Sequence, residues 1–164
     1  MKKNATNTIT NGLKQCLSQE GLEVLGESKE EDMIIFYLGK KANPIFANIS
    51  CTYHMVHEIV ELSMLTINTF FQQDMEHLTE LLNLLNIAEI NNTWSVTPHG
   101  NVEIRSAIAV NPESPDKDQF TRTLKRFMEC ATRVYPAIVN YVSGGKTPQE
   151  SMDKLVEQNK DFFI

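Results

Sequence analysis

Short connections between stretches of alternating apolar and polar residues restrict the fold of this chain more than any other feature. The segments LEVLGES and MIIFYLG (residues 22–28 and 33–39) flank the polar turn KEED. The turn HMVH separates two further alternating segments, residues 45–53 and 58–67. Connections this short join antiparallel strands, because parallel strands need a crossover of about a dozen residues or more. The sequence therefore predicts an antiparallel sheet.

Two more alternating segments surround the turn at Gly100. Trp94 and Val96 share one face of the first segment. One face of the second segment carries Val102, Ile104, Ser106, Ile108 and Val110. A spacing of two residues is the period of a strand, so we predict another hairpin here.

Helical spacing of apolar residues occurs in four other segments. The first runs from Ile9 to Leu17 and ends near Gly21, and the second covers residues 72–85. The third, between residues 120 and 142, contains Pro136, and the fourth opens with TPQE, a capping box with proline at the first helical position. The predicted order is α-β-β-β-β-α-β-β-α-α, an α+β fold whose antiparallel sheet is flanked by helices. We expect one domain over residues 1–164.

Charge and cysteine content narrow the classes of function. The net charge of −6 argues against binding to nucleic acid or to an anionic membrane, since both favour a basic surface. No apolar run approaches the about 20 residues that span a bilayer, and the start has no apolar signal segment. The cysteines Cys16, Cys51 and Cys130 are odd in number and widely spaced, which indicates free thiols in a reducing cytoplasm.

One group of residue types could bind a metal. Cys51, His54, His57 and Glu58 lie at and around the HMVH turn, and a transition metal accepts all of these ligands. Their spacing matches no established metal motif, however. We interpret them as a hairpin tip with solvated histidines and a buried Cys51, and we predict no metal, no cofactor and no catalytic residue.

The leucine-rich second helix has an unusually wide apolar surface. Its apolar residues cover about half of the helix circumference. They are Met75, Leu78, Leu81, Leu82, Leu84 and Leu85. The helix is either an ordinary core helix or one whose excess apolar surface packs on a second copy of the chain. The second interpretation predicts a homodimer with Leu81, Leu84 and Leu85 at its interface.

The strand MIIFYL is apolar on both faces, which is unusual for a strand with one face in solvent. We assign Ile34, Phe36 and Leu38 to the core. We then expect Met33, Ile35 and Tyr37 to face outward, where an adaptable thioether and an amphipathic ring suit the binding of a partner protein. The alternative is that another helix or the C-terminal DFFI segment covers this second face.

A resemblance to known proteins rests on the second helix and the hairpin after it. Leu81, Leu82, Leu85 and Asn86 match a helix that ends Leu-Leu-x-x-Leu-Asn. In the hairpin after it, the matching residues are Gly100, Val102 and Ile104. In this pattern the sequence resembles the YbjN family and, more distantly, class I type III secretion chaperones. The order of elements agrees over residues 8–143, whereas residues 147–164, a short helix and tail, lie beyond it. Thr97 stands where the family often has an acidic residue.

The resemblance implies an α+β fold that is frequently dimeric and has no catalytic residues. In the secretion chaperones it also implies a surface that holds an extended segment of a client protein, whereas a YbjN-like protein could act as a regulator or adaptor. Our first hypothesis is a noncatalytic protein-binding module in the bacterial cytoplasm. The alternative hypothesis is a small-molecule-binding or enzymatic domain that uses the turn at His54 and His57 or a pocket under the last long helix.

Overall fold

The predicted order of helices and strands is confirmed in the computed structural model, which describes residues 2–39, 46–89 and 91–163. A one-turn 3₁₀ helix, η1, precedes the second helix. The elements are α1 (Lys2–Gln19), β1 (Glu23–Lys29), β2 (Met33–Gly39), β3 (Phe46–His54), β4 (Ile59–Thr69), η1 (Gln72–Asp74), α2 (Met75–Ala88), β5 (Thr93–Val96), β6 (Asn101–Ala109), α3 (Lys117–Ser143) and α4 (Pro148–Gln158).

The described strands form one six-stranded sheet in the order β1-β2-β3-β4-β6-β5, and all neighbours are antiparallel. The three short turns therefore join adjacent strands, as predicted. β6 pairs with β4, so β5 occupies one edge of the sheet and β1 the other. A bulge between Val24 and Gly26 interrupts the β1 edge, and such irregularity discourages pairing with strands of other molecules.

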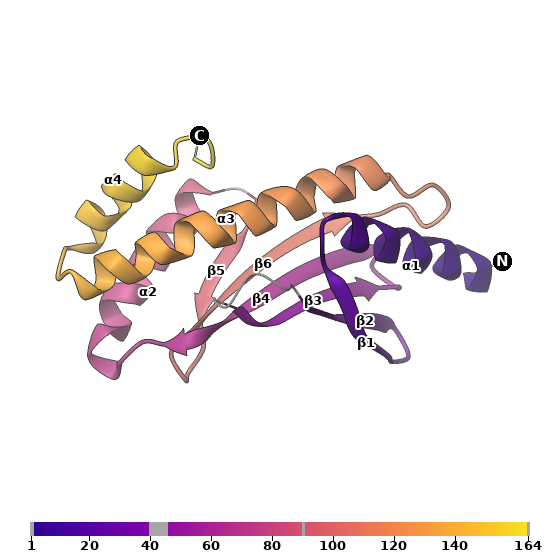
Figure 1. Cartoon of the computed structure of the whole chain (residues 1–164), viewed down its shortest axis with the longest axis horizontal. Coiled ribbons are helices and arrows are strands. Elements are labelled where there is room, and N and C mark those ends of the chain that lie inside the picture. The colour runs from indigo at the N-terminus through magenta and orange to yellow at the C-terminus, as the bar shows by residue number, and fades with distance from the viewer. Residues whose placement is uncertain (1, 40–45, 90, 164) are drawn as a thin grey trace.

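One face of the sheet, which we call the inner face, is buried beneath helices. Ile34, Phe36 and Leu38 of β2 are buried, and Phe36 lies in register with Cys51 of β3. α1 and α3 pack against each other, and in Figure 1 they run along the same side of the sheet. The opposite, outer face carries the alternate residues of each strand. The assignment of the three β2 residues to the core is thus confirmed.

The wide apolar surface of α2 is covered from within the chain. α4 packs on both α2 and α3, and the two shorter helices lie together at the end of the molecule opposite the N-terminus (Figure 1). The predicted capping box begins α4: the Thr147 hydroxyl accepts the Glu150 amide at 3.3 Å, and Glu150 accepts the Thr147 amide at 3.0 Å. α4 therefore provides the second contact that the width of the α2 stripe requires.

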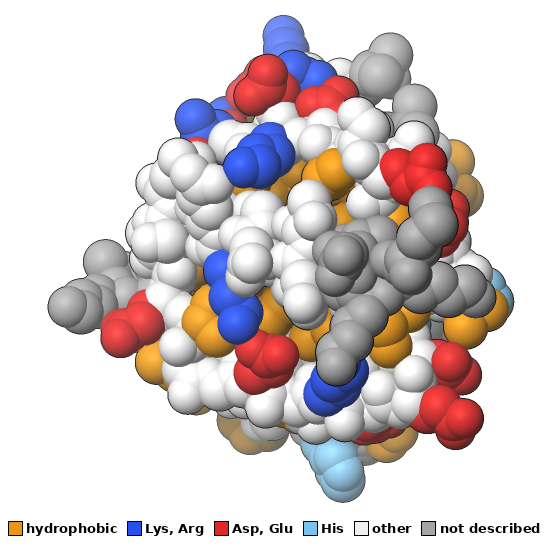
Figure 2. Space-filling model, turned by 90° about the vertical axis from the view of Figure 1, so that its right-hand side faces the viewer, with side chains coloured by type: hydrophobic (Ala, Val, Ile, Leu, Met, Phe, Trp, Pro, Cys, Tyr) orange, Lys and Arg blue, Asp and Glu red, His pale blue; other side chains and the backbone are white. Residues whose placement is uncertain are grey.

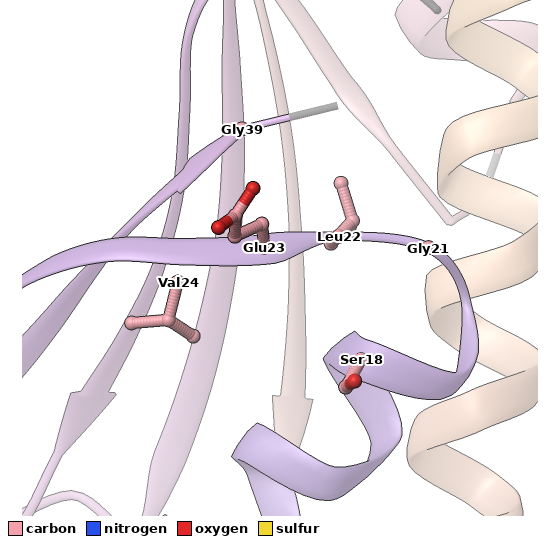
Figure 3. A pocket seen from close by; sticks show the side chains of 6 residues that line it. All are labelled: Ser18, Gly21, Leu22, Glu23, Val24 and Gly39. Atoms are coloured by element: carbon pink, nitrogen blue, oxygen red, sulfur yellow. The ribbon is translucent and has the colours of Figure 1, made fainter. Parts of the chain in front are cut away.

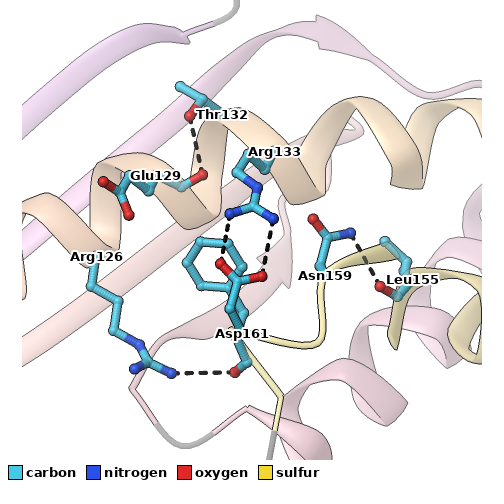
Figure 4. A network of polar contacts seen from close by, with 8 residues as sticks. Arg126, Glu129, Thr132, Arg133, Leu155, Asn159 and Asp161 are labelled. Atoms are coloured by element: carbon cyan, nitrogen blue, oxygen red, sulfur yellow. Dashed lines mark hydrogen bonds and ion pairs between the residues drawn. The ribbon is translucent and has the colours of Figure 1, made fainter. Parts of the chain in front are cut away.

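The C-terminal tail lies on α3. Arg133 donates to both carboxylate oxygens of Asp161 at 2.7 and 3.0 Å, and Arg126 donates to the carbonyl of Phe162 at 3.3 Å (Figure 4). The Phe162 ring is 3% exposed, and the Arg133 guanidinium lies 4.7 Å from its centre. The end of the chain is therefore part of the helical layer, which excludes the alternative that the tail covers the outer face.

Gly100 is a position where the fold leaves no room for a side chain. Its φ is +83°, and a Cβ there would lie 2.6 Å from the carbonyl oxygen of Phe70. Gly145 has a similar φ of +66° but nothing within 4 Å. We expect Gly100→Ala to lower the free energy of unfolding by more than about 2 kcal/mol, and Gly145→Ala by about 1 kcal/mol, because only the first adds a backbone clash to the left-handed strain. Urea denaturation measures both, and equal losses would contradict the clash.

Candidate functional site

The outer face of the sheet is the candidate binding surface. On the four central strands its residues are Met33, Ile35 and Tyr37 of β2, Asn48, Ser50, Thr52 and His54 of β3, Ile59, Glu61, Ser63 and Leu65 of β4, and Glu103, Arg105, Ala107 and Ala109 of β6. All of them are half-buried or exposed. Strand alternation places them opposite the core.

The helices contact the sheet through inner-face residues. The Lys14 ammonium of α1 lies 5.3 Å from the centre of the Phe36 ring. Asn86 of α2 accepts the backbone amide of Trp94 at 2.7 Å, and α3 lines a cleft with Ser106. Because Phe36, Trp94 and Ser106 are all on the inner face, these contacts leave the outer face to solvent in the described part of the chain.

Apolar side chains of the outer face are concentrated on β2. Met33 and Ile35 are half-buried, and Tyr37 is 50% exposed. Next to them in register, His54 of β3 lies between Met33 and Ile59 of β4. We call Met33, Ile35, Tyr37 and Ile59 the apolar strip. The structure places the three predicted binding residues together on one face, and their contact with a partner stays a prediction.

The centre of the outer face is polar. The Ser63 hydroxyl donates to Glu103 at 3.1 Å, and Arg105 donates to the same carboxylate at 3.0 Å. The hydrogen bond that Arg105 donates to Glu103 raises the pKa of the guanidinium, because it stabilises the charged form. The outer face therefore combines an apolar strip with a hydrogen-bonded polar centre.

Hydrophobic side chains are scattered over the face of the molecule seen in Figure 2. Figure 2 turns the right-hand side of Figure 1 toward the viewer and shows separate hydrophobic patches between charged and polar side chains. Exposed examples on other elements include Leu25 of β1 and Ile87 of α2. Single exposed apolar residues are ordinary in soluble folds. No described helix has the length and the apolar character to cross a membrane.

The potential metal ligands at the HMVH turn lie on different sides of the sheet. Cys51 is buried on the inner face, whereas His54 is on the outer face and His57 is exposed in the turn. Burial raises the pKa of the Cys51 thiol to about 12, so it is protonated at neutral pH and a poor ligand or nucleophile. Within residues 2–39, 46–89 and 91–163, no three His, Cys, Asp or Glu side chains are placed to hold a metal.

The candidate dimer residues of α2 are largely inside the single chain. Leu81 and Leu85 have 0% exposure, so neither presents any surface to a second copy. Only Leu84 is partly exposed. The structure thus corrects the interpretation that the excess apolar surface of α2 is free, because α4 covers it. A dimer contact on this helix stays a prediction and depends on Leu84.

One open pocket of about 360 Å³ lies between the end of α1 and the edge of the sheet. Figure 3 shows its lining from Ser18 and Gly21 through Leu22, Glu23 and Val24 to Gly39. It offers one carboxylate and one hydroxyl but no second acid or base beside them. A catalytic pair needs both groups within hydrogen-bonding reach of the substrate, so the described lining supports no reaction.

A buried polar cluster around Glu89 was not identified from the sequence. Glu89 is 3% exposed and accepts hydrogen bonds from the Trp94 indole at 2.8 Å, from the Asn92 amide and from the Cys130 thiol at 3.4 Å. Burial, and then Glu89, raise the pKa of Cys130, so this thiol also stays protonated. The cluster ties the α2–β5 loop to α3, which is a structural role. The sequence signal for this cluster was a single glutamate between apolar residues, in AEI at residues 88–90.

Comparison with known proteins identifies a fold and no sequence family. No family model matches the sequence, and no curated protein matches it. Its antiparallel sheet with helices on one face defines the α+β class. Within that class the fold is YbjN-like: the "Crystal structure of YbjN, a putative transcription regulator from E. coli" matches with a TM-score of 0.52 and 11% identity, over 94% of this chain and 95% of that chain.

This match confirms the predicted fold resemblance and extends it. The matched 94% of the chain is longer than the segment 8–143 on which the sequence pattern rested. At 11% identity the likeness concerns the fold alone.

The two faces of β2 give opposite expectations for a charge. Phe36→Asp would bury an unpaired carboxylate, which costs several kcal/mol, a large share of the about 5–15 kcal/mol that holds a domain folded. Ile35→Asp would place the same group on the outer face. We expect Phe36→Asp to unfold the protein and Ile35→Asp to keep its far-ultraviolet circular dichroism. Unfolding by both variants would mean that β2 is buried on both faces.

Proposed function

We propose that this protein is a noncatalytic binding module that holds a partner polypeptide, as an adaptor, regulator or chaperone, on the outer face of its sheet. The observation that carries the proposal is the apolar strip of β2 and β4 beside a polar centre, on the face that α1, α2 and α3 leave to solvent. An extended segment of a partner could bury Ile35 and Tyr37 and hydrogen-bond to the neighbouring polar groups.

The chemistry of the described residues supports a role without catalysis. Cys51 and Cys130 are buried thiols with raised pKa values, and the ligands at the HMVH turn are divided between the two faces. Activated nucleophiles need the opposite, a lowered pKa or an adjacent base. The hypothesis of an enzyme at His54 and His57 therefore has less support than a binding surface.

Site-specific crosslinking tests the surface. We would replace Tyr37, and separately the exposed Ile87 of α2, by photoreactive benzoylphenylalanine in the native host. A partner of the outer face, other than a second copy of this chain, should crosslink from position 37 and not from position 87. The identified partner would then be purified and its affinity measured by calorimetry.

Matched charge variants complete the test. Ile35→Asp should weaken the measured affinity by about tenfold or more, because partner binding would then have to remove water from the new carboxylate. Ile87→Asp, the same change on another element, should leave the affinity unchanged. A partner that crosslinks equally from both positions, or binds Ile35→Asp normally, would refute the outer face as the binding site.

We also propose that the chain forms a homodimer through Leu84 of α2, which is half-buried within the single chain. A two-fold contact uses one patch twice, so Leu84→Asp would place two charges in the interface. Light scattering at micromolar concentration should give about twice the chain mass of 18.7 kDa, and Leu84→Asp should give the single-chain mass with unchanged circular dichroism. A wild-type protein with the single-chain mass would contradict the dimer.

A further inference from the structure

A small polar cleft lies on the helical side of the molecule, between α3, β6 and the loop that leads into β5. Its volume is about 130 Å³. Its polar lining consists of Asn91, Asn92, Ser106, Arg122, Thr123 and Arg126. The cleft is separated from the outer face by the sheet, because Ser106 is buried on the inner face. It is therefore distinct from the proposed protein-binding surface.

Two arginines line the cleft. Arg122 and Arg126 are four residues apart on α3, which places their side chains on the same side of the helix. Arg122 has no hydrogen bond or ion pair with another described residue. Arg126 uses one terminal nitrogen for the Phe162 carbonyl, and its Nε is buried without a hydrogen-bond partner. The Arg126 Nε is therefore an unpaired buried donor, and the exposed Arg122 guanidinium is a second donor that no described group uses.

The neighbouring carboxylates form no ion pair with these arginines. Asp161, whose pKa is lowered in part by Arg126, pairs with Arg133. Glu89 accepts from Trp94, Asn92 and Cys130, and no ion pair joins it to either arginine of the cleft. The Ser106 hydroxyl donates to the Asn91 carbonyl at 2.9 Å, so the rim of the cleft is fixed to β6. An unsatisfied buried N–H destabilises a fold unless an acceptor from outside reaches it.

We infer that this cleft binds the oxyanion group of a small molecule, a carboxylate or a phosphate. A guanidinium presents paired donors that match both groups, and two guanidiniums one helical turn apart can contact the same anion. The cleft has a volume of about 130 Å³ and is open to solvent on one side. That space accommodates one carboxylate or phosphate group. It is too small for a whole nucleotide, so the rest of such a ligand would lie outside the cleft.

The single tryptophan of the chain provides the readout. The Trp94 indole N–H donates to Glu89, and Asn92, which lines the cleft, donates to the same carboxylate. An anion at the cleft should therefore shift the indole N–H signal in a ¹⁵N-correlated nuclear magnetic resonance spectrum. The probes are inorganic phosphate and succinate, titrated separately into the full chain at constant ionic strength, with chloride as the reference anion.

The variants are Arg122→Gln and, as a control with the same loss of charge, Arg105→Gln on the outer face of β6. We expect saturable binding that Arg122→Gln weakens by about tenfold or more and that Arg105→Gln leaves unchanged. Binding of phosphate alone or of succinate alone would support the site and identify the class of anion. No saturable shift with either probe at tens of millimolar, or equal weakening by both variants, would overturn the inference.

Discussion

The burial of only one face of the sheet is the constraint on which the rest of this structure depends. Strand side chains alternate between faces, so each inner-face residue that packs under α1 or α3 fixes its neighbours outward. Phe36, in register with Cys51, sets this alternation for β2 and β3. The outward position of Ile35 and Tyr37 is therefore a consequence of core packing. An apolar residue that remains on such a face has no role in that core.

The sheet leaves apolar side chains on its outer face in solvent, whereas the C-terminal segment removes apolar surface from solvent. The stripe of α2 is wider than one contact with the sheet can bury, and α4 covers the remainder. The tail then fixes α4 through the Arg133–Asp161 pair and the buried Phe162 ring. Exposed ion pairs contribute little by themselves, so burial of the ring is the larger stabilising term. The chain thus covers its most apolar helix with its own last residues.

Local sequence pattern was sufficient for the elements and for the faces of β2, because both follow from periods of two and of about 3.6 residues. Local pattern was insufficient for features that depend on which distant segments pack against each other. The stripe on α2 indicated that two surfaces must cover it, but it did not indicate whether the second belonged to α4 or to another copy. Glu89 and Cys130 are 41 residues apart in the sequence, and Arg122 and Asn91 line one cleft only after α3 has packed. No local period encodes such contacts.

The two proposed sites lie on opposite sides of one strand. Arg105 of β6 belongs to the polar centre of the outer face, and the adjacent Ser106 lines the cleft beneath α3. The sheet separates a partner bound outside from an anion bound inside, so neither would block the other by direct contact. Energetic coupling would require an element whose position differs between the bound and free states. β6 is the one strand that carries residues of both sites, and its hydrogen bonds to β4 and β5 on either side oppose such a movement. The arrangement therefore favours independent binding at the two sites.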